Sequence, residues 1–236
     1  MVIVQHPTGP NDEEPGAYGR MIDFGRRRDA GRGYLASSDR VGQGVLILHE
    51  WFGLQPFFVS LADRLRDEGF TVLVPDIYEG AVAADVEEAE RLMRAVDDDE
   101  NRIGWMLKAA ASYLIDNWHP RLGVIGFSMG AGWACRLAQE IELEATVLYY
   151  GTSDVEPARW RGAVQGHFAE TDDFEPLQEA RAFMVALEDG GVEVDAHVYP
   201  GTGHWFANRS VPDAYDEASA ELALQRTVSF LRHHLA

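Results

Sequence analysis

The sequence is nearly free of cysteine and lysine, with one of each (Cys135 and Lys108) in 236 residues. One thiol cannot form an intramolecular disulfide, and it excludes a zinc site built from four cysteines. A chain of this length buries enough apolar surface to fold without disulfides. Arginine supplies all the other basic residues. Codon usage and adaptation to salt would each explain this preference for arginine over lysine.

Long apolar runs are also missing. No segment approaches the roughly 18 consecutive apolar residues that a membrane-spanning helix needs. The short apolar run Val2–Val4 has no basic residue before it, so a secretory signal is not predicted and a cytoplasmic location is expected. Residues 1–15 contain three prolines and an acidic cluster, and we expect them to form a mobile leader.

Positive charge is scarce: 39 acidic residues against 20 lysines and arginines give a formal charge of −19. Such a field repels phosphate backbones and anionic lipid, so neither a nucleic acid nor a membrane is an expected partner. A small molecule is the expected partner, and both a monomer and a dimer are left open. The hydrophobic fraction of 46% and the aromatic fraction of 11% exclude an intrinsically disordered chain.

Apolar strand-like segments alternate with amphipathic segments along the chain. Alternation of this kind predicts a mostly parallel sheet with helices on both faces. Without repeats or linkers, residues 1–236 are expected to form a single α/β domain. The predicted strands are 19–24, 33–37, 44–49, 70–74, 122–127, 145–150, 163–168 and 192–198. The predicted helices are 57–68, 85–117 with a break near 97–100, 129–140, 175–189 and 216–233.

The segment Gly126-Phe127-Ser128-Met129-Gly130 matches the G-x-S-x-G nucleophile elbow. It follows an apolar strand and precedes a predicted helix, which is the context that this motif requires. The glycines allow the tight turn that lifts the serine out of the sheet. Ser128 is therefore the predicted nucleophile, and the backbone N–H of Met129 a predicted oxyanion-hole donor. The alternative is a serine that only caps the next helix.

A serine nucleophile needs a base and an acid, which follow it in the order Ser, acid, His in this architecture. His204 is the predicted base, because it lies in a loop after the last predicted strand. Asp172 and Asp173 both follow the strand 163–168, and Asp154 follows the preceding strand. The residues themselves leave the choice of acid open.

The segment His49–Gly53 follows the predicted strand 44–49 and should supply the second oxyanion donor. Within it Glu50 lies at the end of a buried strand, where a charged group is unfavourable unless it is paired or used. We therefore treat Glu50 as a candidate functional residue, with a salt bridge to an arginine as the alternative. The aromatic residues Trp51, Phe52, Trp205 and Phe206 either line an apolar substrate pocket or pack in the core.

At these residues the chain resembles the dienelactone hydrolase family of α/β-hydrolases, from about residue 33 to its carboxyl-terminal helix. The segments that carry the resemblance are His49-Glu50-Trp51-Phe52-Gly53, Pro75-Asp76-Ile77-Tyr78, Tyr149-Tyr150-Gly151, Asp172-Asp173-Phe174-Glu175-Pro176 and Gly203-His204-Trp205-Phe206. The resemblance implies the α/β-hydrolase fold, Asp172 as the acid and His204 as the base. It also implies the N–H of Trp51 as the second oxyanion donor. Glu50 would help to activate the nucleophile, and Tyr78 would contact substrate.

The chain departs from the family pattern at the nucleophile and at the substrate clamp. Ser128 stands where typical members have cysteine, and a glutamate that deprotonates a thiol need not act on a hydroxyl in the same way. Typical members hold the substrate carboxylate with two arginines, and here those positions are Gly80 and Asn208, with Arg209 adjacent. Without this bidentate contact dienelactone itself is not the expected substrate.

The sequence therefore predicts a serine hydrolase of carboxylic esters or lactones that uses no metal and no organic cofactor. One alternative is a non-catalytic α/β-hydrolase scaffold that binds a small ligand or a protein. Another is a metal-dependent hydrolase using His49, Glu50, His167 or His204, although no close ligand-spacing motif supports it. Transfer of the acyl group to an acceptor other than water would use the same three residues.

Overall fold

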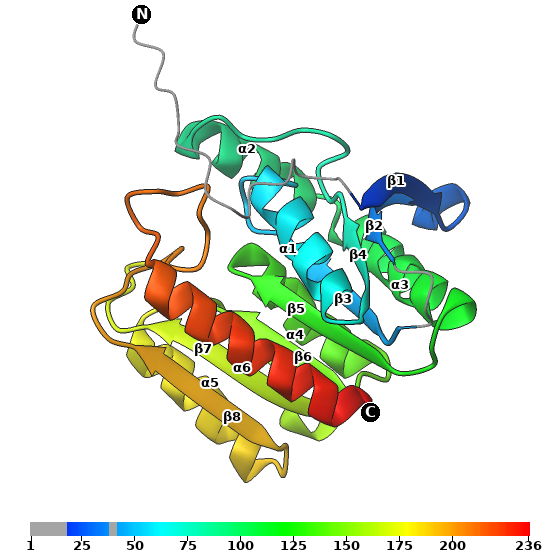
Figure 1. Ribbon diagram of the computed structural model, residues 1–236. Helices are drawn as coiled ribbons and strands as arrows, with labels where there is room; N and C mark the ends of the chain where they lie inside the picture. Colours follow the sequence, from blue (N-terminus) through cyan, green and yellow to red (C-terminus); the bar gives the residue numbers. More distant parts are fainter. Residues whose placement is uncertain (1–17, 38–41) are drawn as a thin grey trace, which may run out of the picture.

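The fold is built on one eight-stranded sheet with the strand order β1-β2-β4-β3-β5-β6-β7-β8 (Figure 1). The computed structural model describes residues 18–37 and 42–236, and the leader expected at 1–15 lies outside these residues. Strands β3 to β8 are parallel, whereas β2 is antiparallel to both β1 and β4. The strands are Gly19–Phe24, Gly31–Ala36, Gly44–Leu48, Thr71–Pro75, Leu122–Phe127, Ala145–Tyr149, Ala163–Ala169 and Val194–Tyr199.

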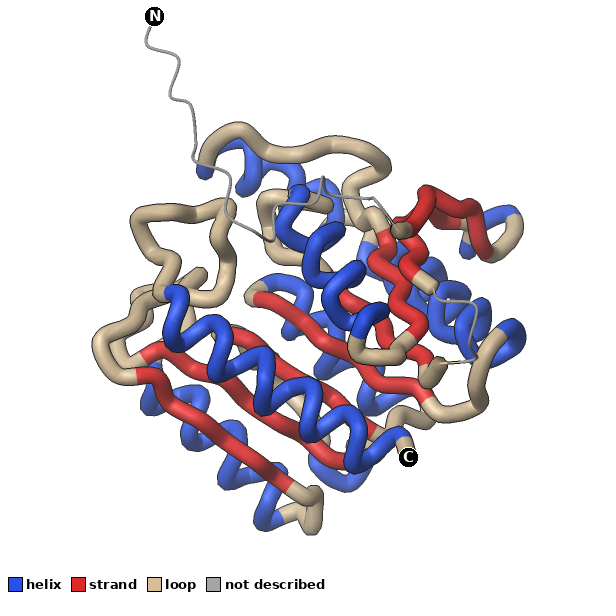
Figure 2. The backbone as a smooth tube through the Cα atoms, viewed as in Figure 1, coloured by secondary structure: helices blue, strands red, loops and turns tan. Residues whose placement is uncertain are grey.

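Helices cover both faces of the sheet, as the alternating pattern predicts (Figure 2). Helices α1 and α6 pack on one face, and α3, α4 and α5 pack on the other. The central strands are buried throughout, so the sheet separates two apolar cores. The helices are Pro56–Asp67, Val86–Asp97, Glu100–Asn117, Met129–Glu140, Leu177–Asp189 and Glu217–Leu235. None of the described helices has the length and apolarity required to span a bilayer.

Three elements start two residues away from the sequence expectation, and each of these differences has a local cause. Strand β2 starts at Gly31, because Gly31 and Arg32 still pair with β1. Helix α5 starts at Leu177 rather than at 175, since Pro176 disfavours a helical conformation in the residue before it. Strand β8 starts at Val194, because Val192 is still bonded to the end of α5. Its N–H donates to the carbonyl of Leu187.

The chain reverses its direction across the sheet at β3. From β3 it passes to β4 on one side, and it later returns to β5 on the other side. In open α/β sheets this switch leaves a crevice beyond the carboxyl ends of the two diverging strands. Glu50 and Trp51 closely follow β3, and Ser128 follows β5 directly. The topology thus brings the two main motifs of the sequence to one edge of the sheet.

Two glycines allow α4 to begin against the ends of β3 and β5. A Cβ atom at Gly130 would lie 2.2 Å from the carbonyl oxygen of Leu48. A Cβ atom at Gly126 would lie 2.4 Å from the carbonyl oxygen of Gly130. Both contacts are with backbone, which cannot rotate away as a side chain can. The glycines of the elbow are therefore required by close packing of backbone on backbone.

Replacing Gly130 with alanine should destabilise the protein by roughly 1–3 kcal/mol or more, because backbone must move to accept the methyl group. Gly132 on the same helix is a matched control, since a Cβ atom there meets nothing closer than 3.9 Å. Gly132→Ala should be neutral or stabilising by up to about 1 kcal/mol through helix propensity. Urea denaturation measures both variants. Equal stabilities for the two would show that the contact with Leu48 is unimportant.

Candidate active site

Ser128, His204 and Asp172 form a continuous series of hydrogen bonds at the carboxyl edge of the sheet. His204 Nδ1 lies 2.8 Å from Asp172 Oδ2, and Nε2 lies 2.9 Å from Ser128 Oγ. A carboxylate only accepts, so Nδ1 carries the imidazole proton and Nε2 is left to accept the serine hydroxyl proton. The side chains of His204 and Asp172 are only 5% and 1% exposed. The structure therefore brings together the three residues predicted as nucleophile, base and acid.

The loop after β7 fixes the orientation of the Asp172 carboxylate. Its Oδ1 atom accepts hydrogen bonds from the backbone N–H groups of Phe174 and Glu175, each at 2.9 Å, which leaves Oδ2 for His204. The Glu175 carboxylate in turn accepts from the backbone N–H and the hydroxyl of Thr152 in the loop after β6. Asp173 takes no part in these bonds. Of the three aspartates that the sequence left open, Asp172 is the one that is hydrogen-bonded to His204.

Three non-glycine residues around this site adopt left-handed backbone conformations. Ser128 has φ +50°, Tyr150 has φ +38° and Trp205 has φ +66°. Each such conformation costs on the order of 1–3 kcal/mol and persists only where the surrounding structure enforces it. The strain is concentrated where three loops meet above the carboxyl ends of the strands. This clustering is typical of a functional site.

Two backbone N–H groups that the sequence predicts as oxyanion donors have no backbone acceptor among the described residues. They belong to Met129, the first residue of α4, and to Trp51, in the loop after β3. The N-terminus of a helix carries a partial positive charge, which adds to the donor at Met129. Tyr78 lies close by, since its hydroxyl is 3.3 Å from Met129 Sδ. These are the groups that the sequence predicts as the oxyanion hole and a substrate contact.

Glu50 is fully buried and is held by a neutral network rather than by an arginine. Its Oε1 atom accepts from Asn208 Nδ2 at 2.8 Å, and Oε2 accepts from the Tyr150 hydroxyl at 3.3 Å. Asn208 Nδ2 also donates to Gln55 Oε1. Burial raises the pKa of Glu50 to about 8, although both hydrogen bonds oppose the shift. No hydrogen bond joins Glu50 to Ser128 within the described ranges.

The sequence does not assign roles to Tyr150 or Gln55 in this network. Tyr150 stands in a segment that carries the family resemblance, but only the structure shows its hydroxyl against Glu50 and its ring 4.8 Å from His204. For Asn208 the sequence shows only that the arginine typical of the family is absent at this position. Its partnership with Glu50 depends on two loops that are 158 residues apart, and no local pattern reveals such a contact.

An aromatic cluster lies beside His204. It consists of Trp51, Phe52, Phe174 and Trp205, with Trp51 stacked on Trp205 at a centroid distance of 6.0 Å. The ring of Trp205 is 4.7 Å from His204, and Phe174 is 57% exposed. The sequence analysis did not select Phe174. Phe206, which it did select, is fully buried on the face covered by α1 and α6 and is not part of this cluster.

Two further histidines use their ring nitrogens within the protein. His49 Nδ1 donates to the carbonyl of Glu50, and Nε2 accepts from the N–H of Ile77. Burial lowers the pKa of His49 to about 4. His167 bonds to Tyr199, and also to Gln165 and Thr227. In this arrangement neither histidine offers a free nitrogen to a metal, so the set His49, Glu50, His167 and His204 does not form a ligand shell.

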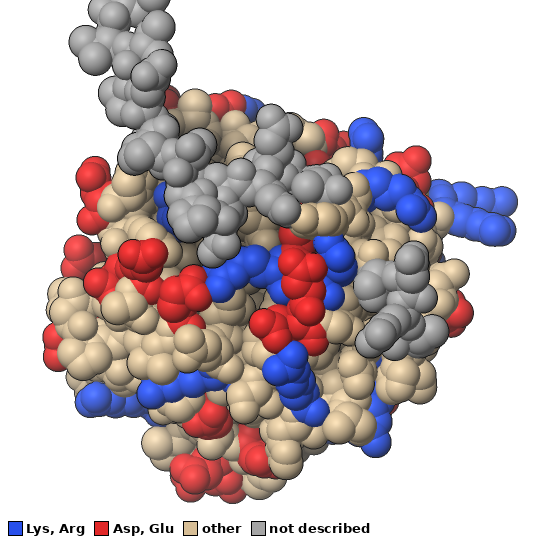
Figure 3. Space-filling view, viewed as in Figure 1, with Lys and Arg blue, Asp and Glu red and all other residues tan. Residues whose placement is uncertain are grey.

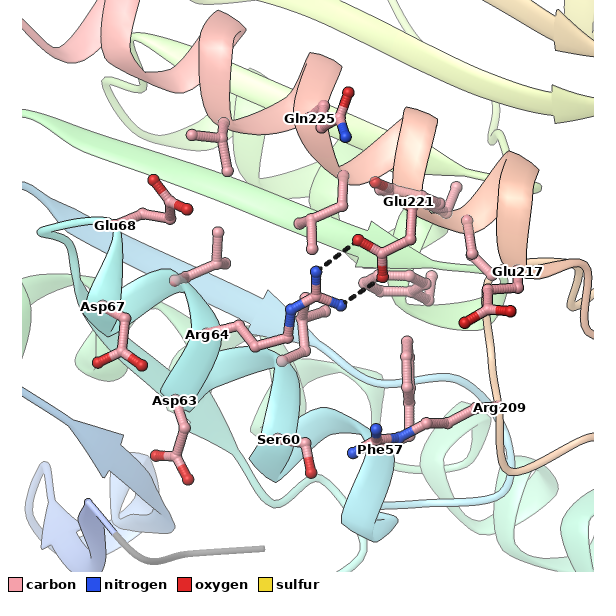
Figure 4. Close-up of a pocket in the computed structure, with 18 of the residues that line it drawn as sticks. Phe57, Ser60, Asp63, Arg64, Asp67, Glu68, Arg209, Glu217, Glu221 and Gln225 are labelled. Atoms are coloured by element: carbon pink, nitrogen blue, oxygen red, sulfur yellow. Dashed lines mark hydrogen bonds and ion pairs between the residues drawn. The ribbon is translucent and has the colours of Figure 1, made fainter. Parts of the chain in front are cut away.

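A groove of about 1070 Å³ separates α1 from α6, and none of Ser128, His204 or Asp172 lines it (Figure 4). Arg64 and Glu221 bridge it with a bidentate ion pair, at 2.7 and 2.8 Å. Arg209 extends along this groove, and the residue at the family's arginine position is Asn208. Acidic and basic side chains are intermixed on this face of the molecule (Figure 3).

The raised pKa of Glu50 predicts a measurable pH dependence of stability. Between pH 4.5 and about 8 the folded protein keeps Glu50 protonated and the unfolded chain does not, so the unfolding free energy falls as the pH rises. Glu50→Gln is neutral throughout. Its stability relative to wild type should therefore increase by at most about 1.4 kcal/mol per pH unit across this window, measured by urea denaturation. If the unfolding free energies of wild type and Glu50→Gln change in parallel with pH, Glu50 is ionised in the folded protein across this range.

The chain is similar to known proteins over most of its length. The sequence pattern of the dienelactone hydrolase family matches residues 32–235. Protein usf of Aquifex pyrophilus is 30% identical over 231 residues, covering 92% of this chain and 99% of that protein. Carboxymethylenebutenolidase of Rhodococcus opacus is 27% identical over 222 residues, covering 86% of each chain.

A solved structure shares the fold. The crystal structure of a dienelactone hydrolase-like promiscuous phosphotriesterase from metagenomic libraries superposes with a TM-score of 0.82. It covers 92% of this chain and 98% of that chain at 19% identity. The expectation of an α/β-hydrolase fold is thereby confirmed, as is the family that the motifs indicate. The chain belongs to the dienelactone hydrolase family of hydrolases.

Proposed function

We propose that this chain is a serine hydrolase of carboxylic esters or lactones. The hydrogen-bonded series Asp172–His204–Ser128 is the observation that carries the proposal. All three side chains required for serine catalysis stand in bonding order, which argues against a non-catalytic scaffold. The proposed mechanism calls for no metal and no organic cofactor.

In the proposed reaction Ser128 Oγ attacks the ester carbonyl while His204 Nε2 takes the hydroxyl proton. Asp172 holds the imidazole in the required tautomer and stabilises the imidazolium that forms. The two backbone N–H groups stabilise the negative charge that develops on the carbonyl oxygen. His204 then protonates the leaving alcohol. Water attacks the acyl-enzyme by the reverse steps and releases the acid.

The surroundings of Ser128 favour a neutral ester. Glu50 is protonated below about pH 8, and its partners Asn208, Tyr150 and Gln55 carry no charge. No cation stands where the family clamps a carboxylate. The aromatic cluster of Trp51, Phe52, Phe174 and Trp205 supplies apolar surface beside His204. We therefore propose a neutral ester or lactone with an apolar group, and not dienelactone.

A fluorophosphonate probe should label the wild-type protein and should not label Ser128→Ala. The probe forms a covalent bond with an activated serine oxygen and releases fluoride, so it reports the nucleophile directly. Ser153→Ala is the control, since Ser153 is an exposed serine in the loop after β6. Intact-protein mass spectrometry measures the adduct. An unlabelled wild-type protein, or equal labelling of Ser128→Ala, would refute the proposal.

A matched pair of aryl esters, one neutral and one carrying a carboxylate on its acyl group, tests the charge preference. The neutral ester should have a kcat/KM higher by about tenfold or more, because neither Gly80 nor Asn208 supplies a cation to offset the field of a protein with charge −19. Raising the ionic strength should narrow the difference by screening that field. Ser128→Ala provides the blank rate. A preference for the carboxylate would mean that a cationic contact exists in the complex.

A further inference from the structure

Two adjacent histidines and a glutamate meet at the edge of the sheet opposite Ser128. Glu193 directly precedes β8, so it lies at the amino end of this parallel strand. His233 and His234 belong to the last turn of α6. Their three donor atoms lie within 4.8 Å of one another. Because Ser128 follows the carboxyl end of β5, this cluster is separate from the candidate active site.

The donor set suits a transition-metal ion. Two imidazoles and one carboxylate are ligands that Zn²⁺ accepts in proteins, with further positions filled by water. A tetrahedral zinc site places neighbouring donors roughly 3.4 Å apart, as bond lengths of about 2.0–2.1 Å require. His234 Nε2 and Glu193 Oε1 are already 3.8 Å apart. Small rotations of the exposed Glu193 and His233 side chains would complete the approach.

The cluster is partly pre-organised. The His234 side chain is 14% exposed, and its ring packs on Phe230 at 4.4 Å, which restricts its orientation. His233 lies next to it with ring centroids 4.7 Å apart. Restricting a ligand before binding reduces the entropy that metal binding must offset. Only Glu193 and His233 then have to be ordered.

The electrostatic surroundings favour a cation. The carboxyl end of α6 carries a partial negative charge, and the protein as a whole carries −19. Two arginines lie at this end of the helix. Arg121 contacts the backbone carbonyls of His234 and Ala236 rather than the imidazoles. Arg232 pairs with Glu68. The ring nitrogens of His233 and His234 therefore do not compete with Arg121 for a partner.

We propose that Glu193, His233 and His234 bind one divalent transition-metal ion of the Zn²⁺ class. The ion would connect the end of α6 to the turn that leads into β8. Strand β8 is the last strand of the sheet and pairs only with β7 among the described strands. A metal at this point would therefore strengthen the attachment of an edge strand, which is a structural role independent of Ser128.

Isothermal titration of the metal-free full chain with Zn²⁺ should give one site per chain. Zn²⁺ should also raise the thermal midpoint in a concentration-dependent manner, and EDTA should reverse this, because binding to the folded state alone stabilises it. Co²⁺ should produce a visible absorption spectrum typical of bound imidazole and carboxylate. Glu193→Gln and His234→Gln should each weaken Zn²⁺ binding by at least about tenfold.

Two variants serve as controls. Glu188→Gln removes the same charge from an exposed position of α5, and His119→Gln removes an imidazole that is not part of the cluster. Both should bind Zn²⁺ as wild type does. Circular dichroism in EDTA checks that all variants fold. Absence of one-site binding in wild type, or equal affinity in Glu193→Gln and wild type, would overturn the proposal.

Discussion

The contact between the first turn of α4 and the end of β3 fixes where Ser128 and the loop after β3 stand relative to each other in the candidate active site. At Gly130 the helix lies so close to the carbonyl of Leu48 that no side chain fits between them. The contact sets the first turn of α4, which begins at Met129, against the end of β3, where the loop that contains Trp51 begins. Oxyanion stabilisation depends on donors that are in place before the reaction begins. Backbone packing, rather than any side chain, supplies this pre-organisation.

The buried Glu50 network connects the loops that surround this contact. Glu50 belongs to the loop after β3, Tyr150 follows β6, and Asn208 follows His204 along the chain. Typical members of the family have an arginine at the position of Asn208. In this chain the partners of Glu50 at that position and around it are uncharged. An amide and a phenol can hold a protonated carboxyl group without introducing charge. The network joins three loops. In the proposed mechanism the serine is activated by His204 and not by Glu50.

The sequence indicated the fold and most of the candidate site because both depend on local patterns. Alternating apolar strands and amphipathic helices predict the layered sheet, and the elbow motif marks Ser128 through its glycines. The choice between Asp172 and Asp173 needed the family resemblance or the structure, since both follow the same strand. The Tyr150–Glu50–Asn208 network was beyond sequence analysis, because it joins residues far apart in the chain. Phe206 was selected because it is close to His204 in sequence, yet its side chain is fully buried in the core on the side of α1 and α6.

The left-handed conformations of Ser128, Tyr150 and Trp205 have a consequence for how this protein can evolve. Glycine at Tyr150 or Trp205 would relax the backbone, but it would also remove a ring that contacts His204. Greater stability and the present shape of the site are therefore in competition at the same positions. Substitutions that increase stability would therefore change the shape of the site if they occur in the loops around His204. Variants that keep both rings must gain their stability elsewhere, in the two cores on either side of the sheet.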